Sequence, residues 1–451
     1  MNTQEDKIQG LPGGGNSDVQ NAYKTDADMS AAVVPVEHLD ALTPHQRLAY
    51  DDIIAWIESF NIGQAASARI LAGYAGTGKT FLVKALVKAL RSSTVLCAPT
   101  NQAVKELQKL GTGLTCCTIY SLLGLKMEQH EDTLRLVKAI GSKIHRYQYV
   151  ILDECSMVSP ELYVYIEQAM RGGVRFLFVG DPKQLPPIGH ATSPIWKKFE
   201  TCVLTEVIRY DNQILEFATR VRKLKLADLV LASNNSKSEG VWYLNGLKFE
   251  ERVRKHAKVG LFTSSETKIL CWRNNTVAAY NHIVRHVLYG DRVFTSQYLV
   301  GDHLVFTSPH TISEGFEVFT DDQAVVTEVT VAKHADYDFK CYYLTVDLYS
   351  RLGTVKVIHE DDQRLFDKLL TGYAAAARSG DRSMWGRFWA LKESVASVKY
   401  AHALTVHRAQ GSTYKNVFVD VGDILANPNK SEARKCLYVG ATRPTTKLYL
   451  T

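Results

Sequence analysis

One short segment carries the strongest chemical signal in this sequence. Residues 73–80 read GYAGTGKT, a complete GxxxxGK[ST] pattern between an apolar run and an amphipathic one. Glycines here let backbone N–H groups turn towards phosphate oxygens, and the N-terminus of the following helix adds positive potential. We expect Lys79 to reach the β- and γ-phosphates and the Thr80 hydroxyl to bind Mg²⁺. The predicted phosphate site comprises Gly73, Gly76, Thr77, Gly78, Lys79 and Thr80.

Two adjacent carboxylates complement this phosphate site. Asp153 and Glu154 directly follow the apolar run YVIL, so both side chains are expected at the end of a buried strand. We predict that Asp153 binds Mg²⁺, directly or through water, and that Glu154 orients the attacking water as general base. An acidic pair can also cap a helix. Its position at the next strand but one after the glycine-rich loop favours the catalytic interpretation.

Three further side chains are candidates for contact with the terminal phosphate. Gln184, in GDPKQ, follows another apolar strand and could hydrogen-bond a γ-phosphate or its attacking water. For this segment in isolation, an ordinary turn is the stronger interpretation. Arg209, in LTEVIRY, and Arg443, in LYVGATRP, could neutralise charge that develops during hydrolysis. A single arginine is usually a surface residue, so these two depend on the rest of the pattern.

The elements that must position these residues alternate between strands and helices. Apolar runs in ARILAG, STVLCA, VILD and RFLFVG each lead into a polar segment. Buried strands separated by helices favour a parallel sheet with functional loops at its carboxyl edge. A first helix is expected after the Thr43-Pro44 start. Its shared apolar face is predicted to comprise Leu42, Leu48, Ile53 and Ile57.

The pattern divides the chain into four parts. Residues 1–38 are polar and glycine-rich, so a disordered tail is expected. Residues 39–206 predict a first α/β domain, and 207–290 together with 397–451 predict a second. Residues 291–396 alternate like antiparallel strands and then become helical, which predicts a small β insertion with a helical extension.

Composition excludes several classes of protein. The 53 Lys+Arg and 47 Asp+Glu give a net charge of +6, which fits a local nucleic-acid groove but is also common among other enzymes. Eight cysteines without a CxxC pair favour reduced thiols over a structural zinc. No apolar stretch approaches the ~20 residues that span a bilayer, and the N-terminus is unlike a secretory signal. We therefore expect a cytoplasmic protein with no membrane partner.

Eight segments in order resemble the motifs of superfamily 1B DNA helicases. They are GYAGTGKT, CAPTNQAVKEL, TIYSLLGL, DECSM, GDPKQLPPIG, LTEVIRY, LTVHRAQGSTY and LYVGATR. The similarity runs from LTPHQ to the C-terminus and is strongest to the RecD-like branch with the Dda-type helicases of T-even phages. It implies an α/β fold of two RecA-like P-loop NTPase domains. An inserted β-hairpin, the pin, is implied at about 121–144, and an SH3-like β accessory domain with a helical arm at 291–396.

The resemblance also assigns roles to individual positions. It implies that Gln46 reads the adenine edge, that Gln410 and Gly411 approach the γ-phosphate, and that Arg209 and Arg443 are arginine fingers. Its implied positions along or near single-stranded DNA are Pro99, Thr100, Pro187, Asn274, Thr405 and His407.

Aromatic side chains and the implied pin add further candidates for DNA contact. Trp272 could stack on a base, which would contribute about 1–3 kcal/mol, although core packing is the alternative. The same two interpretations apply to Trp385 and Phe388, and for these two core packing is favoured. The pin tip would fall near residues 129–131. His130 could stack there on the terminal base pair, but a solvated loop histidine is equally compatible.

Two positions depart from the family pattern. Tyr74 stands where the family often has proline, which should alter loop stiffness more than chemistry. Position 208 is Ile, where more distant helicases place an aromatic residue to stack on adenine.

These observations predict an ATP-dependent DNA helicase that uses ATP and Mg²⁺, translocates 5′→3′ on single-stranded DNA and unwinds duplexes. The direction comes from the resemblance alone. The alternative is a single-stranded-DNA translocase that displaces bound proteins with little unwinding, since it would share every ATP-site residue. Expected partners are single-stranded and forked DNA, with single-stranded-DNA-binding or other replication proteins as further candidates. We expect a monomer in a bacterial or phage-infected cell, acting in replication, recombination or repair.

Overall fold

The computed structural model describes residues 41–61, 67–90, 93–130, 133–139, 141–207, 213–236, 238–312, 315–348 and 350–451. The tail predicted at 1–38 lies outside the described residues, as do Ile208 and Arg209. Within the described part of the chain, no helix combines the length and apolar character that crossing a membrane requires.

A six-stranded sheet, parallel throughout, forms the centre of the first α/β unit, in the order β3-β2-β6-β7-β1-β8. Every residue of the central strands β2, β6 and β7 is buried, as expected for a parallel sheet with both faces covered. The four apolar runs predicted as strands are β1, β2, β6 and β7. The bounds are β1 (Ala68–Gly73), β2 (Thr94–Ala98), β3 (Cys116–Thr118), β6 (Tyr149–Leu152), β7 (Arg175–Gly180) and β8 (Thr201–Leu204).

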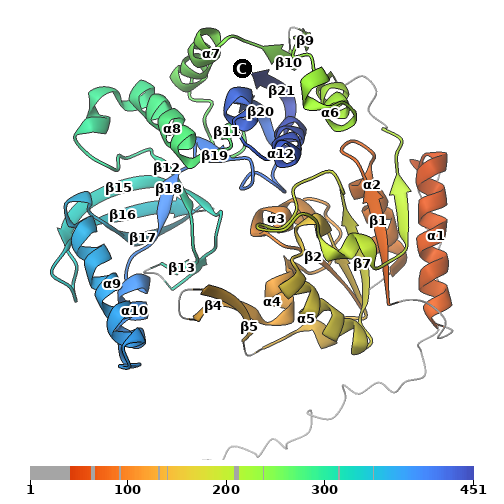
Figure 1. Cartoon of the computed structure of the whole chain (residues 1–451), viewed down its shortest axis with the longest axis horizontal. Helices are drawn as coiled ribbons and strands as arrows, with labels where there is room; N and C mark the ends of the chain where they lie inside the picture. Colours follow the sequence, from red (N-terminus) through yellow and green to blue (C-terminus); the bar gives the residue numbers. More distant parts are fainter. Residues whose placement is uncertain are drawn as a thin grey trace, which may run out of the picture. The chain divides into compact units, whose positions relative to one another are not determined.

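Five helices lie around this sheet (Figure 1). They are α1 (Pro44–Asn61), α2 (Lys79–Leu90), α3 (Asn101–Gln108), α4 (Ile119–Leu123) and α5 (Pro160–Arg171). The buried face of α1 differs from the prediction, because Leu48 is 69% exposed. Leu48 is five residues before the fully buried Ile53, which turns it about 140° away around the helix. The buried face instead includes Ala49, Tyr50, Ile53, Trp56 and Ile57.

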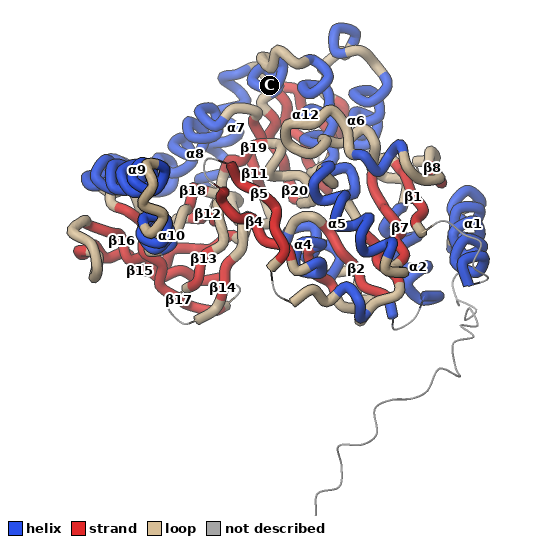
Figure 2. The backbone as a smooth tube through the Cα atoms, turned by 60° about the horizontal axis from the view of Figure 1, so that its bottom comes forward, coloured by secondary structure: helices blue, strands red, loops and turns tan. Residues whose placement is uncertain are grey.

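A two-stranded antiparallel hairpin is inserted between α4 and β6, where the pin was predicted (Figure 2). It consists of β4 (Leu125–His130) and β5 (Thr133–Lys138). Its base is fixed to the first unit, because Leu125 is buried in that unit's core and the Tyr165 hydroxyl on α5 donates to the Leu136 carbonyl at 2.9 Å. His130 is the last residue of β4, and a stacking role for it stays a prediction.

The second α/β unit is assembled from two distant parts of the sequence. Its six strands run in the order β19-β11-β20-β21-β10-β9, and only the β9–β10 pair is antiparallel. The strands are β9 (Asn234–Asn235), β10 (Gly240–Tyr243), β11 (Thr267–Cys271), β19 (Ala403–Thr405), β20 (Tyr414–Val419) and β21 (Pro444–Leu450). The helices are α6 (Gln213–Lys223), α7 (Gly246–Lys258), α8 (Asn274–Tyr289), α11 (Val421–Leu425) and α12 (Lys430–Thr442).

An antiparallel sheet of five strands, in the order β17-β16-β15-β12-β18, forms the accessory unit. Its strands are β12 (His303–Phe306), β15 (Gln323–Lys333), β16 (Lys340–Leu348), β17 (Arg351–Ile358) and β18 (Val398–Tyr400), and a small ladder joins β13 (His310–Thr311) to β14 (Glu317–Val318). We predicted that residues 397–451 belong to the second α/β domain. In the structure β18 instead pairs with β12 at the edge of the accessory sheet. A strand of three residues is too short to show an alternation pattern.

The helical extension of the accessory unit is a pair of helices, α9 (Gln363–Arg378) and α10 (Met384–Glu393). Phe366 of α9 and Leu391 of α10 pack with Phe339 and Cys341 in one buried cluster. Phe388 is also buried, with its ring edge-on to those of the flanking Trp385 and Trp389. Phe388 therefore packs in the interior, as the core interpretation expected.

Candidate active site

The glycine-rich loop joins β1 to α2 and needs glycine for two reasons. Gly76 and Gly78 have φ of +79° and +77°, in the left-handed region that favours glycine. A Cβ atom on Gly76 would lie 2.7 Å from Cδ1 of Leu215 on α6, so the loop packs directly against the second unit. The segment thus forms the turn that a phosphate-binding loop requires, at the surface where the two units meet.

Two side chains brace the inside of this loop. The Lys79 amine donates to the carbonyls of Gly73 at 2.7 Å and Tyr74 at 3.1 Å. The amide of Gln46, which is 2% exposed, donates to the carbonyls of Thr77 and Gly78, both at 3.4 Å. Lys79 therefore stands at the loop's centre, and Gln46 joins the start of α1 to the loop.

Asp153 and Glu154 lie at the end of β6, facing the loop. Glu154 has a φ of +53°, which is strained for a residue other than glycine, and its backbone N–H donates to Oδ1 of Asp153 at 2.8 Å. Burial, and after it the neighbouring Asp153 carboxylate, raise the pKa of Glu154 to about 7, although the charges of Arg443 and Lys79 oppose the rise. Burial also raises the pKa of Asp153. Two buried carboxylates so close together call for a compensating cation.

The donor set fits Mg²⁺, which prefers carboxylate and hydroxyl oxygens. Oε2 of Glu154 is buried and makes no hydrogen bond to any described residue. The Thr80 hydroxyl group belongs to the same cavity as both carboxylates. Asp153 and Thr80 are the residues that would hold the ion, and its charge would relieve the two buried carboxylates and offset the negative charge of the phosphates.

Side chains from the second unit reach across to the end of β7 in the first. The Gln410 amide donates to Oε1 of Gln184 at 3.3 Å and to the Ser156 hydroxyl at 3.2 Å. Further along the same seam, the guanidinium of Arg222 on α6 lies 3.5 Å from the centroid of the Tyr74 ring. Tyr74, the departure from the family pattern, therefore adds a cation–π contact that proline could not make.

A second cross-seam contact centres on Tyr438 of α12. Its hydroxyl donates to Oδ2 of Asp181 at 2.5 Å and accepts from the Ala75 backbone N–H at 3.0 Å. Asp181 and Tyr438 are both buried, and both were missed as site residues. The signal was available, because Asp181 lies in GDPKQ and Tyr438 in LYVGATR. In these two segments the sequence analysis predicted Gln184 and Arg443 as site residues, but not Asp181 or Tyr438.

Arg443, the last of the predicted catalytic residues, is buried just after α12. Its guanidinium donates to the carbonyls of Val439 and Ser412 and to the Thr442 hydroxyl, at 3.2, 3.1 and 3.0 Å. These bonds hold the charge at the wall of the cavity, where it opposes the rise that burial causes in the pKa values of Asp153 and Glu154. The other predicted arginine, Arg209, lies outside the described residues.

A cavity of about 720 Å³ brings these groups together. Predicted residues from the first unit that line it are Gln46, Gly76, Gly78, Lys79, Thr80, Asp153, Glu154 and Gln184; those from the second are Gly411 and Arg443. Three predicted residues do not line the cavity, but each is hydrogen-bonded to one that does: Gly73 to Lys79, Thr77 to Gln46, and Gln410 to Gln184. Asp181, Thr413 and Thr442 also line the cavity and were not predicted.

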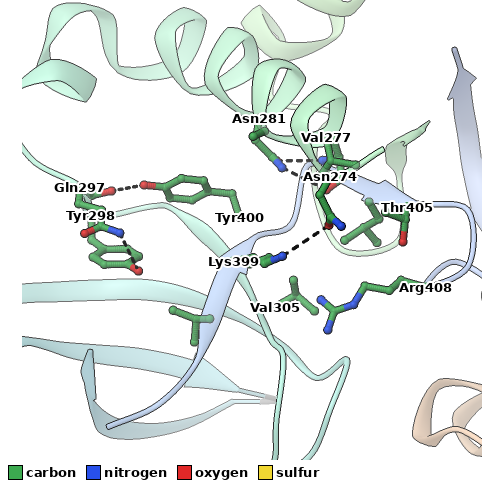
Figure 3. Close-up of a pocket in the computed structure, with 14 residues that line it drawn as sticks. Asn274, Val277, Asn281, Gln297, Tyr298, Val305, Lys399, Tyr400, Thr405 and Arg408 are labelled. Carbon is green, nitrogen blue, oxygen red and sulfur yellow. Dashed lines mark hydrogen bonds between the residues drawn. The ribbon is translucent and has the colours of Figure 1, made fainter. Parts of the chain in front are cut away.

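The residues expected along the DNA strand fall into two groups. Thr100 caps α3, with its hydroxyl accepting from the Ala103 N–H at 3.2 Å, and follows the buried Pro99. Asn274 begins α8 and Thr405 ends β19, and both line a separate cavity of about 270 Å³ (Figure 3). In that cavity the Lys399 amine donates to Oδ1 of Asn274 at 3.5 Å.

The remaining strand candidates have their own contacts. Nε2 of His407 lies 3.2 Å from Oε1 of Glu432 on α12. Trp272 is partly buried against the core of the second unit, and its backbone N–H donates to Oδ2 of Asp423 at 2.6 Å. Pro187 is buried in the loop after β7.

Comparisons with known proteins agree with this architecture. Residues 59–236 match the family model of an AAA domain, and residues 400–451 match that of a UvrD-like helicase C-terminal domain. The chain is 26% identical to the ATP-dependent DNA helicase dda of Enterobacteria phage T4, over 82% of this chain and 91% of that protein. It is also 26% identical to an uncharacterized protein of Acanthamoeba polyphaga mimivirus, over 84% of this chain and 94% of that protein.

The fold is similar to that of a solved structure of two coordinating Pif1 helicases on forked double-stranded DNA. The TM-score is 0.50 at 16% sequence identity, over 90% of this chain and 92% of that chain. The two α/β units are thus RecA-like domains, accompanied by an accessory domain. The chain thus contains an AAA domain and a UvrD-like helicase C-terminal domain, and its homologues include superfamily 1B DNA helicases such as the dda helicase of phage T4 and the RecD2 helicase of Deinococcus radiodurans.

Proposed function

We propose that this protein is an ATP-dependent DNA helicase that moves 5′→3′ along single-stranded DNA and separates duplexes ahead of it. Hydrolysis would take place between the two RecA-like domains. The single observation that carries the proposal is the 720 Å³ cavity, because its wall combines the glycine-rich loop and carboxylates of one domain with Gly411 and Arg443 of the other. A triphosphate bound there would touch both domains, so its cleavage would change how they meet.

The residues of the cavity divide the chemistry between them. Lys79 would exchange its two loop carbonyls for β- and γ-phosphate oxygens, and Arg443 would meet charge developing on the γ-phosphate. Glu154, with an unpartnered buried oxygen, would accept a proton from the attacking water. Gln184 would orient that water or the γ-phosphate, and its bond to Gln410 would report the change to the second domain.

The strand would lie against the same segments that close the cavity. Thr100 lies beside Gly411, because a Cβ on Gly411 would be 3.5 Å from the Thr100 hydroxyl and 3.1 Å from Cβ of Ala103. Thr405 and Asn274 line the neighbouring cavity on the second domain. A nucleotide-dependent shift at the Gly411 contact would therefore move the residues that we propose as contacts for DNA phosphates.

Polarity and strand separation are tested with two substrates. Duplexes carrying either a 5′ or a 3′ single-stranded tail report unwinding, and biotinylated single strands bound to streptavidin report translocation without unwinding. We expect unwinding from the 5′ tail and streptavidin displacement from the 3′ end. Displacement without unwinding would favour the protein-displacing translocase instead. Activity confined to the 3′ tail would contradict the proposed polarity.

Two variants tie these activities to the cavity. Lys79→Ala should abolish oligonucleotide-stimulated ATP hydrolysis, and Glu154→Gln should abolish turnover while retaining ATP binding. Asp51→Asn is a matched control, because Asp51 is an exposed carboxylate of α1 paired with Arg47. Full turnover in Glu154→Gln would remove Glu154 from its role as general base.

A further inference from the structure

The accessory domain presents two adjacent carboxylates on one tight turn, between β14 and β15. Asp321 has a φ of +69°, in the left-handed region that is unfavourable for most residues. The turn is held on β12, because the Asp321 N–H donates to the Phe306 carbonyl and the Phe306 N–H donates to the Asp322 carbonyl, both at 2.9 Å. Oδ2 of Asp322 accepts from the Phe319 N–H at 2.9 Å. This acidic turn, residues 319–322, is thus built to hold both carboxylates in place.

Each carboxylate pairs with a cation from a different RecA-like domain. Oδ1 of Asp322 accepts from the Lys105 amine at 2.8 Å, and the Asp322 side chain is only 5% exposed. Oδ1 of Asp321 lies 3.5 Å from Nε of Arg408. Lys105 belongs to α3 of the first domain, and Arg408 follows β19 of the second. One turn of the accessory domain therefore holds a positive charge from each half of the ATPase.

Both cations stand beside groups predicted to hold the strand. Lys105 is five residues after Thr100, on the helix that Thr100 caps. Arg408 is three residues after Thr405 and lines the same cavity as Thr405, Asn274 and Lys399, into which Figure 3 shows it pointing. Lysine and arginine at such positions are the groups that neutralise backbone phosphates.

The acidic turn carries two unfavourable features that its cations help to offset. The two carboxylates are neighbours in sequence and repel each other, and burial raises the pKa of Asp321 while Arg408 and Lys105 oppose that rise. A left-handed aspartate and a desolvated acidic pair together disfavour the turn in the absence of its partners. Other anions that bound Lys105 and Arg408 would therefore release the acidic turn from both RecA-like domains.

We propose that Lys105 and Arg408 are two phosphate contacts for single-stranded DNA, and that the Asp321–Asp322 turn occupies them as a stand-in for phosphate until the strand arrives. The inference rests on the proposed function, since it concerns the same strand. DNA binding then exchanges two carboxylates for two phosphates and frees the accessory domain from both RecA-like domains at once. The accessory domain becomes a competitor of the strand in the DNA-free protein.

The test removes both charges and keeps the turn. In Asp321→Asn/Asp322→Asn, asparagine tolerates the left-handed backbone, and its Oδ1 can still accept from the Phe319 N–H. Asp336→Asn/Asp338→Asn is the charge-matched control, since these two carboxylates are exposed on the same domain and Asp338 pairs with Lys333 within the β15–β16 hairpin. The full-length chain is titrated with fluorescein-labelled oligo(dT) over a range of salt concentrations without nucleotide.

We expect the turn variant to bind at least about fivefold more tightly than wild type at low salt, and the control to match wild type. Its log–log salt dependence should steepen by about 0.7 for each freed cation, because binding would then release counterions that the carboxylates had replaced. Unchanged or weaker binding by the turn variant, or equal tightening in both variants, would overturn the inference.

Wild-type ATP hydrolysis, measured with the same oligonucleotide, separates this inference from the proposed function. If wild type binds the oligonucleotide and its turnover rises, a null result in the turn variant counts against the acidic turn alone. If wild type neither binds nor responds, both proposals fail. A thermal unfolding curve for each variant establishes that the compared proteins are folded.

Discussion

The Tyr438 hydroxyl lies 2.5 Å from Oδ2 of Asp181 and joins α12 of the second RecA-like domain to the end of β7 in the first. The same hydroxyl accepts from the Ala75 N–H at 3.0 Å, inside the glycine-rich loop. The Tyr438 hydroxyl thus contacts both the glycine-rich loop and the residue that follows β7. Tyr438 belongs to α12, the helix that directly precedes Arg443. The distance between that arginine and the loop should therefore depend on this hydroxyl.

We predict that Tyr438→Phe lowers oligonucleotide-stimulated kcat for ATP by about tenfold with a small change in KM. Removing the hydroxyl leaves Asp181 buried without its cross-domain donor, which typically costs about 1–3 kcal/mol. The first-domain wall of the cavity stays intact, so ATP binding should change little. Tyr449→Phe is the control, because Tyr449 is equally buried but lies in a separate core cluster of the second domain. A parallel loss of activity in both variants would contradict a role specific to Tyr438.

Gly411 offers a second test of how closely the two domains must approach. Its φ is +79°, and a Cβ there would lie 3.1 Å from Cβ of Ala103 on α3. Gly411→Ala should strain the loop and push it away from α3, so DNA-stimulated turnover should fall at least about tenfold, the equivalent of a 1–3 kcal/mol backbone strain. Gly386→Ala in α10 is the matched change, since nothing lies within 4 Å of its added Cβ. Turnover by Gly411→Ala equal to that of the control would show that this contact is not needed.

The sequence predicted site residues that belong to local motifs, but it did not predict contacts between residues far apart in the chain. GxxxxGK[ST] and the acidic pair after YVIL place Lys79, Asp153 and Glu154 through local strand-to-loop geometry, and those residues do line one cavity. Tyr438 and Asp181 are 257 residues apart, and neither position shows from its own neighbours that the two side chains will meet. The same holds for Asp322 and Lys105, which are 217 residues apart.

Two errors in the fold have equally local causes. Leu48 was assigned to the buried face of α1 because it is apolar, although its angular position places it with solvent. Val398–Tyr400 was assigned to the second α/β domain because the chain returns there at β19, only a few residues later. The hydropathy of a single residue does not show which face of a helix is buried, and a strand of three residues is too short to show which sheet it will join.

Lys268 gives a prediction about stability and pH. It is fully buried at the junction of β11 with the accessory sheet, where its amine donates to Oε1 of Gln323 at 2.9 Å and to the Ala401 carbonyl at 2.5 Å. Burial lowers the pKa of Lys268 to about 7, and burial, followed by the charge of Lys268, lowers the pKa values of the nearby His303 and His402. The unfolded chain, with an ordinary lysine, binds more protons than the folded one between about pH 7 and 10.

Because the unfolded state binds more protons in that window, this group makes the free energy of unfolding rise as pH increases from 7 to 9, by on the order of 2 kcal/mol. Lys268→Met should remove that component and make the protein more stable than wild type at pH 7, by about 1–2 kcal/mol. Denaturant unfolding of both proteins at pH 7 and 9 measures the difference and cancels the contribution of other groups. An identical pH dependence in the two proteins would mean that Lys268 keeps its ordinary pKa.

The hairpin β4–β5 provides the last prediction, which separates strand opening from ATP turnover. Its base is tied to α5 by the bond from the Tyr165 hydroxyl to the Leu136 carbonyl at 2.9 Å. Tyr165→Phe removes that bond, worth about 1 kcal/mol, and should let the hairpin yield when a duplex is driven against it. We expect unwinding of a 5′-tailed duplex to slow about threefold, within the range that such a bond allows, while oligonucleotide-stimulated hydrolysis stays at the wild-type rate. Tyr147→Phe, another half-buried tyrosine packed against the same core, controls for the loss of a hydroxyl. If Tyr165→Phe slowed hydrolysis and unwinding equally, the hairpin would belong to the motor's ATPase cycle and would not act as a separate wedge.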